Sequence, residues 1–215
     1  MSKRKLSSWI DAFIEYTDNT EPSLMYRRWT AISTIAAVMQ RKCWLAWGTE
    51  TFYPNMYIVL VGPPAARKGT AMKQGKELLD KIGVPLSADE SSRQKLVKTL
   101  SEIGTVNQAE HQGPLTFHAS LTIFSSELTV FLGFQNNELL SMLCKWYDCE
   151  SRFVYDTHAR GKEEVANVWV NLFGATTPTM LQTSMPESAV GSGFTSRTVF
   201  VYEEDKGKVV IFPSL

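Results

Sequence analysis

The chain has 215 residues, of which 44% are hydrophobic, and can bury the core of one good-sized domain. Basic and acidic residues both number 22, which excludes a globally basic surface for nucleic acid, so any such contact must be local or combine several subunits. Cys43, Cys144 and Cys149 lack zinc spacing, which favours a reduced, cytoplasmic protein without a structural metal. Asp11 interrupts the segment after the basic N-terminus, and the uncharged stretch 29–40 is too short for a bilayer, so we expect no membrane association.

Residues 1–50 are predicted to form an N-terminal helical extension. Apolar residues recur at helical spacing over 9–17 and again over 24–40. Residues 43–47 have the pattern of a short strand, and residues 51–55 are expected to connect it to the next strand. Residues 51–215 then alternate apolar strands with helices, which predicts an α/β core with a mostly parallel sheet.

Residues 57–70, YIVLVGPPAARKGT, have the pattern of a phosphate-binding loop. A β-branched apolar run ends in a glycine-led turn that holds one lysine and then a threonine. In such a loop, backbone N–H groups surround an anion at a helix start, the ammonium reaches the terminal phosphates, and the hydroxyl lies near Mg²⁺. Thr70 is the candidate Mg²⁺ ligand. The residues expected to bind the nucleotide are Gly62, Pro63, Pro64, Ala65, Ala66, Arg67, Lys68, Gly69 and Thr70.

The loop departs from the standard pattern G-x-x-x-x-G-K-[ST]. Gly62 and Lys68 are in register, but Arg67 stands where the second glycine belongs, and Thr70 comes one residue late, after Gly69. Because that position often needs a positive φ, either the loop has a different shape or Gly69 supplies the flexibility. An ordinary strand–turn–helix junction is the alternative interpretation.

Behind the loop we expect helices over 71–82 and 94–103, and then an apolar strand over 120–124 that is followed by Glu127. A carboxylate at the carboxyl end of such a strand can polarise the attacking water, so Glu127 is the catalytic candidate. An aspartate usually precedes this glutamate and holds Mg²⁺ through water, whereas this chain has Ser126. An exposed glutamate that merely begins a helix is an equal alternative.

The last third of the chain adds candidates for a sensor and for an arginine finger. Residues 148–156 are expected to be extended or a hairpin, and residues 165–173 a single apolar strand. At the tip of that strand, beside the strand of the catalytic carboxylate, Thr176 or Thr177 can sense the γ-phosphate, although Thr-Pro is also a generic turn. Arg197 ends a glycine-rich loop and can reach a neighbouring subunit's phosphates, while an intramolecular salt bridge fits the spacing equally well.

Five segments, GPPAARKGT, TIFSSEL, KWYDC, NLFGATTP and GSGFTSRTVFVY, occur in one order within residues 9–206. That order resembles a family of phage and mobile-element P-loop ATPases, RecA-like, usually described as replicative helicases or primase-associated helicase domains. The resemblance implies ATP and Mg²⁺ as cofactors, and a homo-oligomeric ring that translocates on single-stranded DNA, with a possible replication partner such as a primase. It also implies that Lys68 and Thr70 bind the nucleotide and that Glu127 is the catalytic carboxylate. Thr176 and Thr177 would then contain the sensor, and Arg197 would act across a subunit interface.

The expected function is Mg²⁺-dependent ATP hydrolysis coupled to DNA unwinding or remodelling. A nucleotide-binding scaffold with weak turnover stays open because of Ser126. A small-molecule kinase also stays open, although the wide spacing of Arg152, Arg160 and Arg197 does not favour the arginine-rich lid of such enzymes. Relatives usually continue as a helical stretch after the final strand, whereas this chain ends at Leu215. A truncated relic, one half of a split gene and a minimal ATPase are therefore all compatible with the sequence.

Trp44, Trp47 and Trp146 are candidates for stacking on bases. Core packing is the expectation for most of them, because they lie at apolar strand or helix positions.

Overall fold

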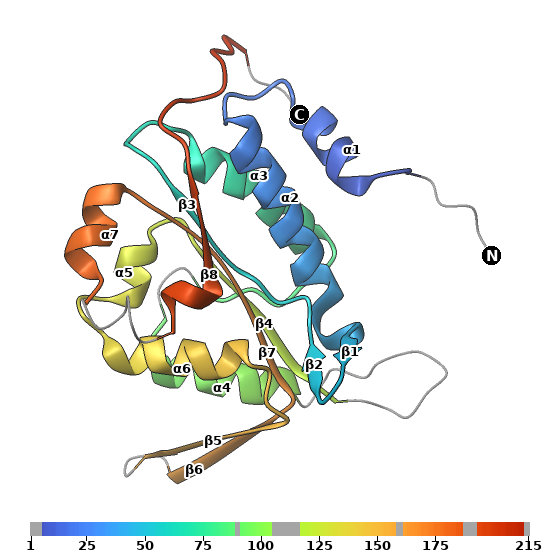
Figure 1. The fold of residues 1–215 in the computed structure, drawn as a ribbon, viewed down its shortest axis with the longest axis vertical. Coiled ribbons are helices and arrows are strands. Elements are labelled where there is room, and N and C mark those ends of the chain that lie inside the picture. The colour runs from blue at the N-terminus through green and yellow to red at the C-terminus, as the bar shows by residue number, and fades with distance from the viewer. Residues whose placement is uncertain (1–5, 89–90, 105–116, 158–160, 187–192, 213–215) are drawn as a thin grey trace.

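The computed structural model describes the chain except for residues 1–5, 89–90, 105–116, 158–160, 187–192 and 213–215. Its centre is a four-stranded, all-parallel sheet with the strand order β4-β7-β3-β8 (Figure 1). This arrangement confirms the predicted α/β class and the parallel sheet. The strands span Tyr57–Val61 (β3), Ala119–Ser125 (β4), Val168–Thr176 (β7) and Thr198–Tyr202 (β8).

Helices cover both faces of this sheet (Figure 1). Every residue of β3 is buried, as expected for a parallel strand that is covered on both sides. Ile58 and Leu60 pack in the core beneath α2 and α3, whereas Tyr57 and Val59 pack in the core on the opposite side. The helices are α2 (Leu24–Met39) and α3 (Lys68–Lys81) on one face, and α4 (Arg93–Gly104), α5 (Leu128–Leu132) and α6 (Asn137–Tyr147) on the other.

The two predicted N-terminal helices are confirmed as α1 (Trp9–Tyr16) and α2. Serine side chains cap both helices, because Ser8 accepts the N–H of Asp11 and Ser23 accepts the N–H of Tyr26. Tyr26 is fully buried against the sheet, so α2 supplies part of the core on its face.

The chain between α2 and β3 differs in part from the prediction. A short 3₁₀ turn (Gln40–Lys42) is followed by β1 (Leu45–Trp47) and β2 (Glu50–Phe52), which form an antiparallel hairpin. The strand predicted over 43–47 is confirmed, but the expected connection over 51–55 is wrong in its first half. Among the described strands this hairpin forms a sheet of its own, and all six of its strand residues are exposed.

The single strand predicted over 165–173 is also wrong. Residues up to Ala166 belong to β6 (Gly161–Ala166), which pairs with β5 (Arg152–Thr157) in an antiparallel hairpin, and β7 begins at Val168. The region expected to be extended or a hairpin over 148–156 thus supplies only the first strand of this hairpin. Asn167 separates the two strands with a φ of 52°, and its side-chain amide donates a hydrogen bond to the carbonyl of Phe117 at 2.7 Å. This left-handed residue turns the chain from one sheet into the other.

The other elements agree closely with the prediction. The helix expected over 71–82 begins three residues earlier, at Lys68, and the one expected over 94–103 begins at Arg93. The chain closes with α7 (Pro178–Ser184) and a 3₁₀ turn (Thr195–Arg197) before β8. Among the described residues, no helix combines the length and the apolarity that crossing a membrane requires.

Candidate functional site

A cavity of about 440 Å³ lies at the edge of the sheet where β3, β4 and β7 end. Its walls come from three segments that are remote in sequence: the loop after β3 with the first turn of α3, the end of β4 and the end of β7. The carboxyl ends of parallel strands share one edge of a sheet, and ligands of α/β proteins bind there. The lining residues are Pro64, Ala65, Arg67, Lys68, Gly69, Thr70, Ser126, Glu127, Thr176 and Thr177.

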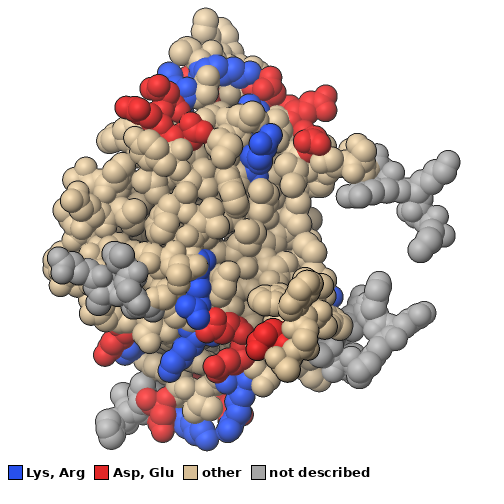
Figure 2. All heavy atoms as spheres, in the orientation of Figure 1, with Lys and Arg blue, Asp and Glu red and all other residues tan. Residues whose placement is uncertain are grey.

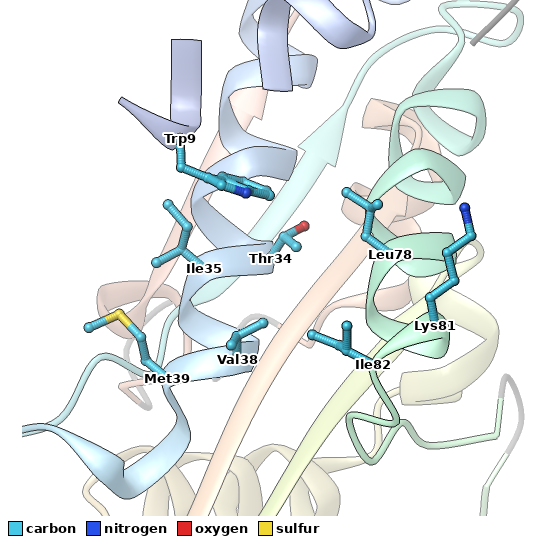
Figure 3. A pocket seen from close by; sticks show the side chains of 8 residues that line it. All are labelled: Trp9, Thr34, Ile35, Val38, Met39, Leu78, Lys81 and Ile82. Atoms are coloured by element: carbon cyan, nitrogen blue, oxygen red, sulfur yellow. The ribbon is translucent and has the colours of Figure 1, made fainter. Parts of the chain in front are cut away.

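A second cavity, of about 450 Å³, lies between α2 and α3, with Trp9 of α1 at its border (Figure 3). The side chains that surround it are almost all apolar, and Lys81 is the only charged one among them. A polyphosphate needs several donors and positive charges, which this groove does not offer. The cavity at the strand ends is therefore the candidate nucleotide site.

The loop between β3 and α3 contains two non-glycine residues in the left-handed region, Ala65 with a φ of 65° and Arg67 with a φ of 62°. The sequence left open a loop of different shape or flexibility from Gly69, but the arginine itself takes the conformation usually given to glycine. Gly69 lies inside α3 with open space around it, and so it does not supply the loop's flexibility. A left-handed non-glycine residue costs on the order of 1 kcal/mol, and such residues cluster at functional sites.

Gly62, Pro63 and Ala66 belong to the predicted loop but do not line the cavity. Gly62 instead fixes the base of the loop, because a Cβ there would overlap the Tyr26 hydroxyl and the carbonyl oxygen of Glu203. Its N–H also donates to the carbonyl of Thr176 at 3.3 Å, which ties the loop to the end of β7.

Lys68 is the first residue of α3, and its ammonium folds back over the loop. Nζ donates to the carbonyl oxygens of Gly62, at 2.7 Å, and Pro63, at 2.8 Å. Partial burial lowers the pKa of Lys68, and the nearby carboxylate of Glu127 opposes that shift. The ammonium thus lies in the cavity within electrostatic reach of the candidate catalytic carboxylate.

Glu127 directly precedes α5, as expected if it were only an exposed glutamate that begins a helix, but its side chain makes no capping hydrogen bond. Its side chain and that of Ser126 are exposed and line the cavity, as does Thr70 in the first turn of α3. Within the described part of the chain, no three His, Cys, Asp or Glu side chains form a group that could hold a metal ion. A Mg²⁺ ion here would take hydroxyl groups and water from the protein side, and phosphate oxygens from a nucleotide.

The two threonines at the end of β7 differ in their contacts. The Thr177 hydroxyl caps α7 by accepting the N–H of Met180 at 3.3 Å. Thr176 is buried, and its hydroxyl makes a long contact of 3.5 Å with the carbonyl of Thr177. Thr176 is therefore the better candidate for sensing a ligand.

Arg197 lies at the opposite edge of the sheet from the cavity. It precedes β8, whose first residue pairs with the first residue of β3, whereas the cavity lies beyond the last residue of β3. Its guanidinium forms two hydrogen bonds of 3.0 Å with Asp148 and a third, of 3.2 Å, with the carbonyl of Gly193. The intramolecular salt bridge is thus observed, and action on a neighbouring subunit stays a prediction.

Two residues that reach this region had no signal in the local sequence pattern. Tyr26 donates its hydroxyl to the carbonyl oxygens at the ends of two strands, Val61 at 2.7 Å and Glu203 at 3.0 Å. Glu21, in the turn between α1 and α2, forms an ion pair with Arg67. Both lie more than 30 positions before the residues that they contact, so only the fold brings them to the site.

Neither a protein-family model nor a curated protein sequence matches this chain, so the candidate site depends on its own geometry.

Proposed function

We propose that this chain is a P-loop ATPase domain of the RecA-like type, which binds ATP with Mg²⁺ in the cavity at the strand ends and hydrolyses it. One observation carries the proposal. The sequence predicted nucleotide-binding residues in three segments, which follow or end β3, β4 and β7. All three segments line a single cavity at the edge of the sheet where ligands of α/β proteins bind.

In this proposal, different groups of the chain bind the phosphates, orient the water and sense the terminal phosphate. The N–H groups that begin α3, together with the Lys68 ammonium, neutralise phosphate charge. Glu127 holds and orients the attacking water, and Thr176 responds to the terminal phosphate. Thr70, which lines the cavity, would hold Mg²⁺, and the ion would supply positive charge that stabilises the phosphates. Most of the catalysis in this scheme is positioning and electrostatic stabilisation.

We further propose that the domain acts on single-stranded DNA as a homo-oligomeric ring, in replication or unwinding, with a partner such as a primase. The exposed hairpin supports the DNA contact: Trp44 and Trp47 are 65% and 70% exposed, and the exposed Lys42 precedes them. Trp146, by contrast, is fully buried and is excluded from stacking. For Arg197 to serve a neighbour's phosphates, it would have to leave Asp148.

The test is the steady-state rate of ATP hydrolysis with Mg²⁺. Lys68→Ala is expected to abolish turnover because the phosphates lose their ammonium, and Glu127→Gln is expected to retain bound ATP without hydrolysing it. Lys73→Ala and Glu77→Gln are matched controls, since these two residues pair with each other on α3 and do not line the cavity. Normal turnover in both site variants would refute the assignment.

The second candidate is a scaffold that binds nucleotide without turnover. Ser126 in place of the usual aspartate favours it, because the metal then lacks a carboxylate anchor. Nucleotide binding that is insensitive to Mg²⁺, with no hydrolysis, would identify the scaffold. A phosphorylated small-molecule acceptor would instead identify a kinase.

A further inference from the structure

Arg67 combines an unusual backbone with a position at the cavity. It lines the cavity, it takes a left-handed φ of 62°, and it directly precedes Lys68. A glycine would adopt this conformation without strain. The chain therefore carries a guanidinium at a backbone position that costs stability, and strain of this kind occurs where a site needs a particular side chain.

Glu21 holds the Arg67 side chain from one side. Nε of Arg67 lies 2.5 Å from Oε2 of Glu21. Among the described residues, none accepts a hydrogen bond from the two Nη groups, which leaves the other edge of the guanidinium for an anion. Arginine can bind two oxyanions in this way, because its five N–H groups point outward from a planar fork.

Glu21 is itself fixed in place. Its side chain is only 14% exposed, and its Oε1 lies 3.4 Å from the Lys206 ammonium and accepts the N–H of Val210 at 3.5 Å. Its backbone carbonyl accepts the N–H of Gly207 at 2.8 Å. The segment after β8 thus clamps the α1–α2 turn and presents a rigid carboxylate to Arg67.

Arg197 cannot supply a guanidinium to the cavity of its own chain, since it lies at the other edge of the sheet. We propose that Arg67 binds the phosphate chain of the nucleotide from within the same subunit, and that Glu21 is a positioning residue that orients Arg67 for this contact. The inference rests on the proposed nucleotide site and names a phosphate-binding group that the usual loop pattern lacks.

The test for Arg67 is the dissociation constant for MgATP in three variants. Arg67→Gln removes the charge and keeps a non-glycine residue at the left-handed position, so the backbone strain stays similar. Arg67→Gly removes both the charge and the strain, and Arg67→Lys keeps the charge without the fork. We expect affinity to fall about tenfold or more for Gln and Gly, and less for Lys, as for the loss of a charge-assisted hydrogen bond. Affinity equal to wild type in the Gln and Gly variants would overturn the proposal.

The positioning role of Glu21 is tested by whether Glu21→Gln tightens or weakens the binding of MgATP. If Glu21 acted only through its negative charge, Glu21→Gln would tighten the binding of an anion. If it orients Arg67, the same change weakens MgATP binding by roughly two- to tenfold, because the loosened side chain must be ordered on binding. The effect should vanish when Arg67→Gln is already present, and Glu204→Gln, a neutralised carboxylate on the same segment, should not weaken binding. Tighter or unchanged binding in Glu21→Gln would overturn the positioning role.

The Lys68→Ala variant separates this inference from the function on which it rests. If the wild type binds MgATP, Lys68→Ala abolishes that binding and every Arg67 variant keeps it, the inference about Arg67 is overturned and the proposed function is not. Failure of the wild type to bind MgATP overturns both.

Discussion

At the scale of single residues, the cavity depends on a coupled pair of opposite charges. Burial lowers the pKa of Lys68, and the carboxylate of Glu127 counteracts it. A phosphate needs the protonated ammonium, so in the proposed site the pKa of Lys68 would set the pH range in which a nucleotide binds.

This coupling predicts a pH dependence with a definite sign. As the pH rises through the lowered pKa of Lys68, the ammonium loses its proton and affinity for MgATP should fall. Glu127→Gln removes the charge that raises this pKa, so the fall should begin at a lower pH than in wild type. Titrating the dissociation constant against pH in both proteins, with Glu77→Gln as control, checks this. A profile that moves to higher pH in Glu127→Gln would contradict the pairing.

At the scale of elements, the loop is anchored at the junction of α2, β3 and β8. The buried Tyr26 hydroxyl lies against the last carbonyl of β3 and the carbonyl of Glu203, and Gly62 leaves room for it. The N-terminal helices are thus part of the support of the candidate site.

Gly62→Ala tests this anchor. The added Cβ would overlap a hydroxyl and a backbone oxygen, so we expect a loss of about 1–3 kcal/mol in the free energy of unfolding. Tyr26→Phe alone should cost about 1 kcal/mol for the buried hydrogen bond. Tyr26→Phe also removes the hydroxyl oxygen that the new Cβ would overlap. The double variant should therefore lose less free energy of unfolding than the two single variants together, as measured by denaturant unfolding. Strict additivity would show that the two residues are not in contact.

The β1–β2 hairpin permits a second test at this scale. Trp44→Ala combined with Trp47→Ala should leave the melting temperature almost unchanged, since both side chains are largely exposed. If the hairpin stacks on bases, the pair should weaken binding to single-stranded DNA by about 1–3 kcal/mol per stacked base, as seen in fluorescence anisotropy. Phe134→Ala is a matched control, because Phe134 is 75% exposed in a different part of the fold. Equal DNA affinity in wild type and double variant would remove the hairpin from the proposed interface.

Sequence periodicity predicted the elements whose signal is local. Apolar patterning predicted the buried run at β3 and most of the helix α3. The rule that parallel strands end at one edge predicted that Glu127 and Thr176 would line the same cavity. The break at Asn167 was missed because the residues on both sides of it are apolar and only a left-handed φ separates two strands. The Glu21–Arg67 contact leaves no periodic signal in the sequence, because it depends on how the α1–α2 turn packs against the loop after β3.

At the scale of the whole molecule, the face drawn in Figure 2 has no broad basic area among its described residues. Figure 2 shows that most acidic and basic side chains on the visible face gather towards its two ends, with a wide uncharged region between them. Ion pairs also gather around the α1–α2 turn, where they join Asp18, Glu21, Arg27, Arg67, Lys206 and Lys208. The formal net charge of zero gives a single copy no overall electrostatic attraction for a long nucleic acid. The proposed ring would have to bring local basic and aromatic groups from several copies together.

The most direct test of the central claim is a calorimetric titration of the full chain with MgATP, carried out in parallel on wild type, Lys68→Ala and the control Lys73→Ala. The proposed site predicts one nucleotide per chain for wild type and control, and a large loss of affinity in Lys68→Ala. No binding in wild type, or equal binding in all three proteins, would contradict the assignment of the cavity.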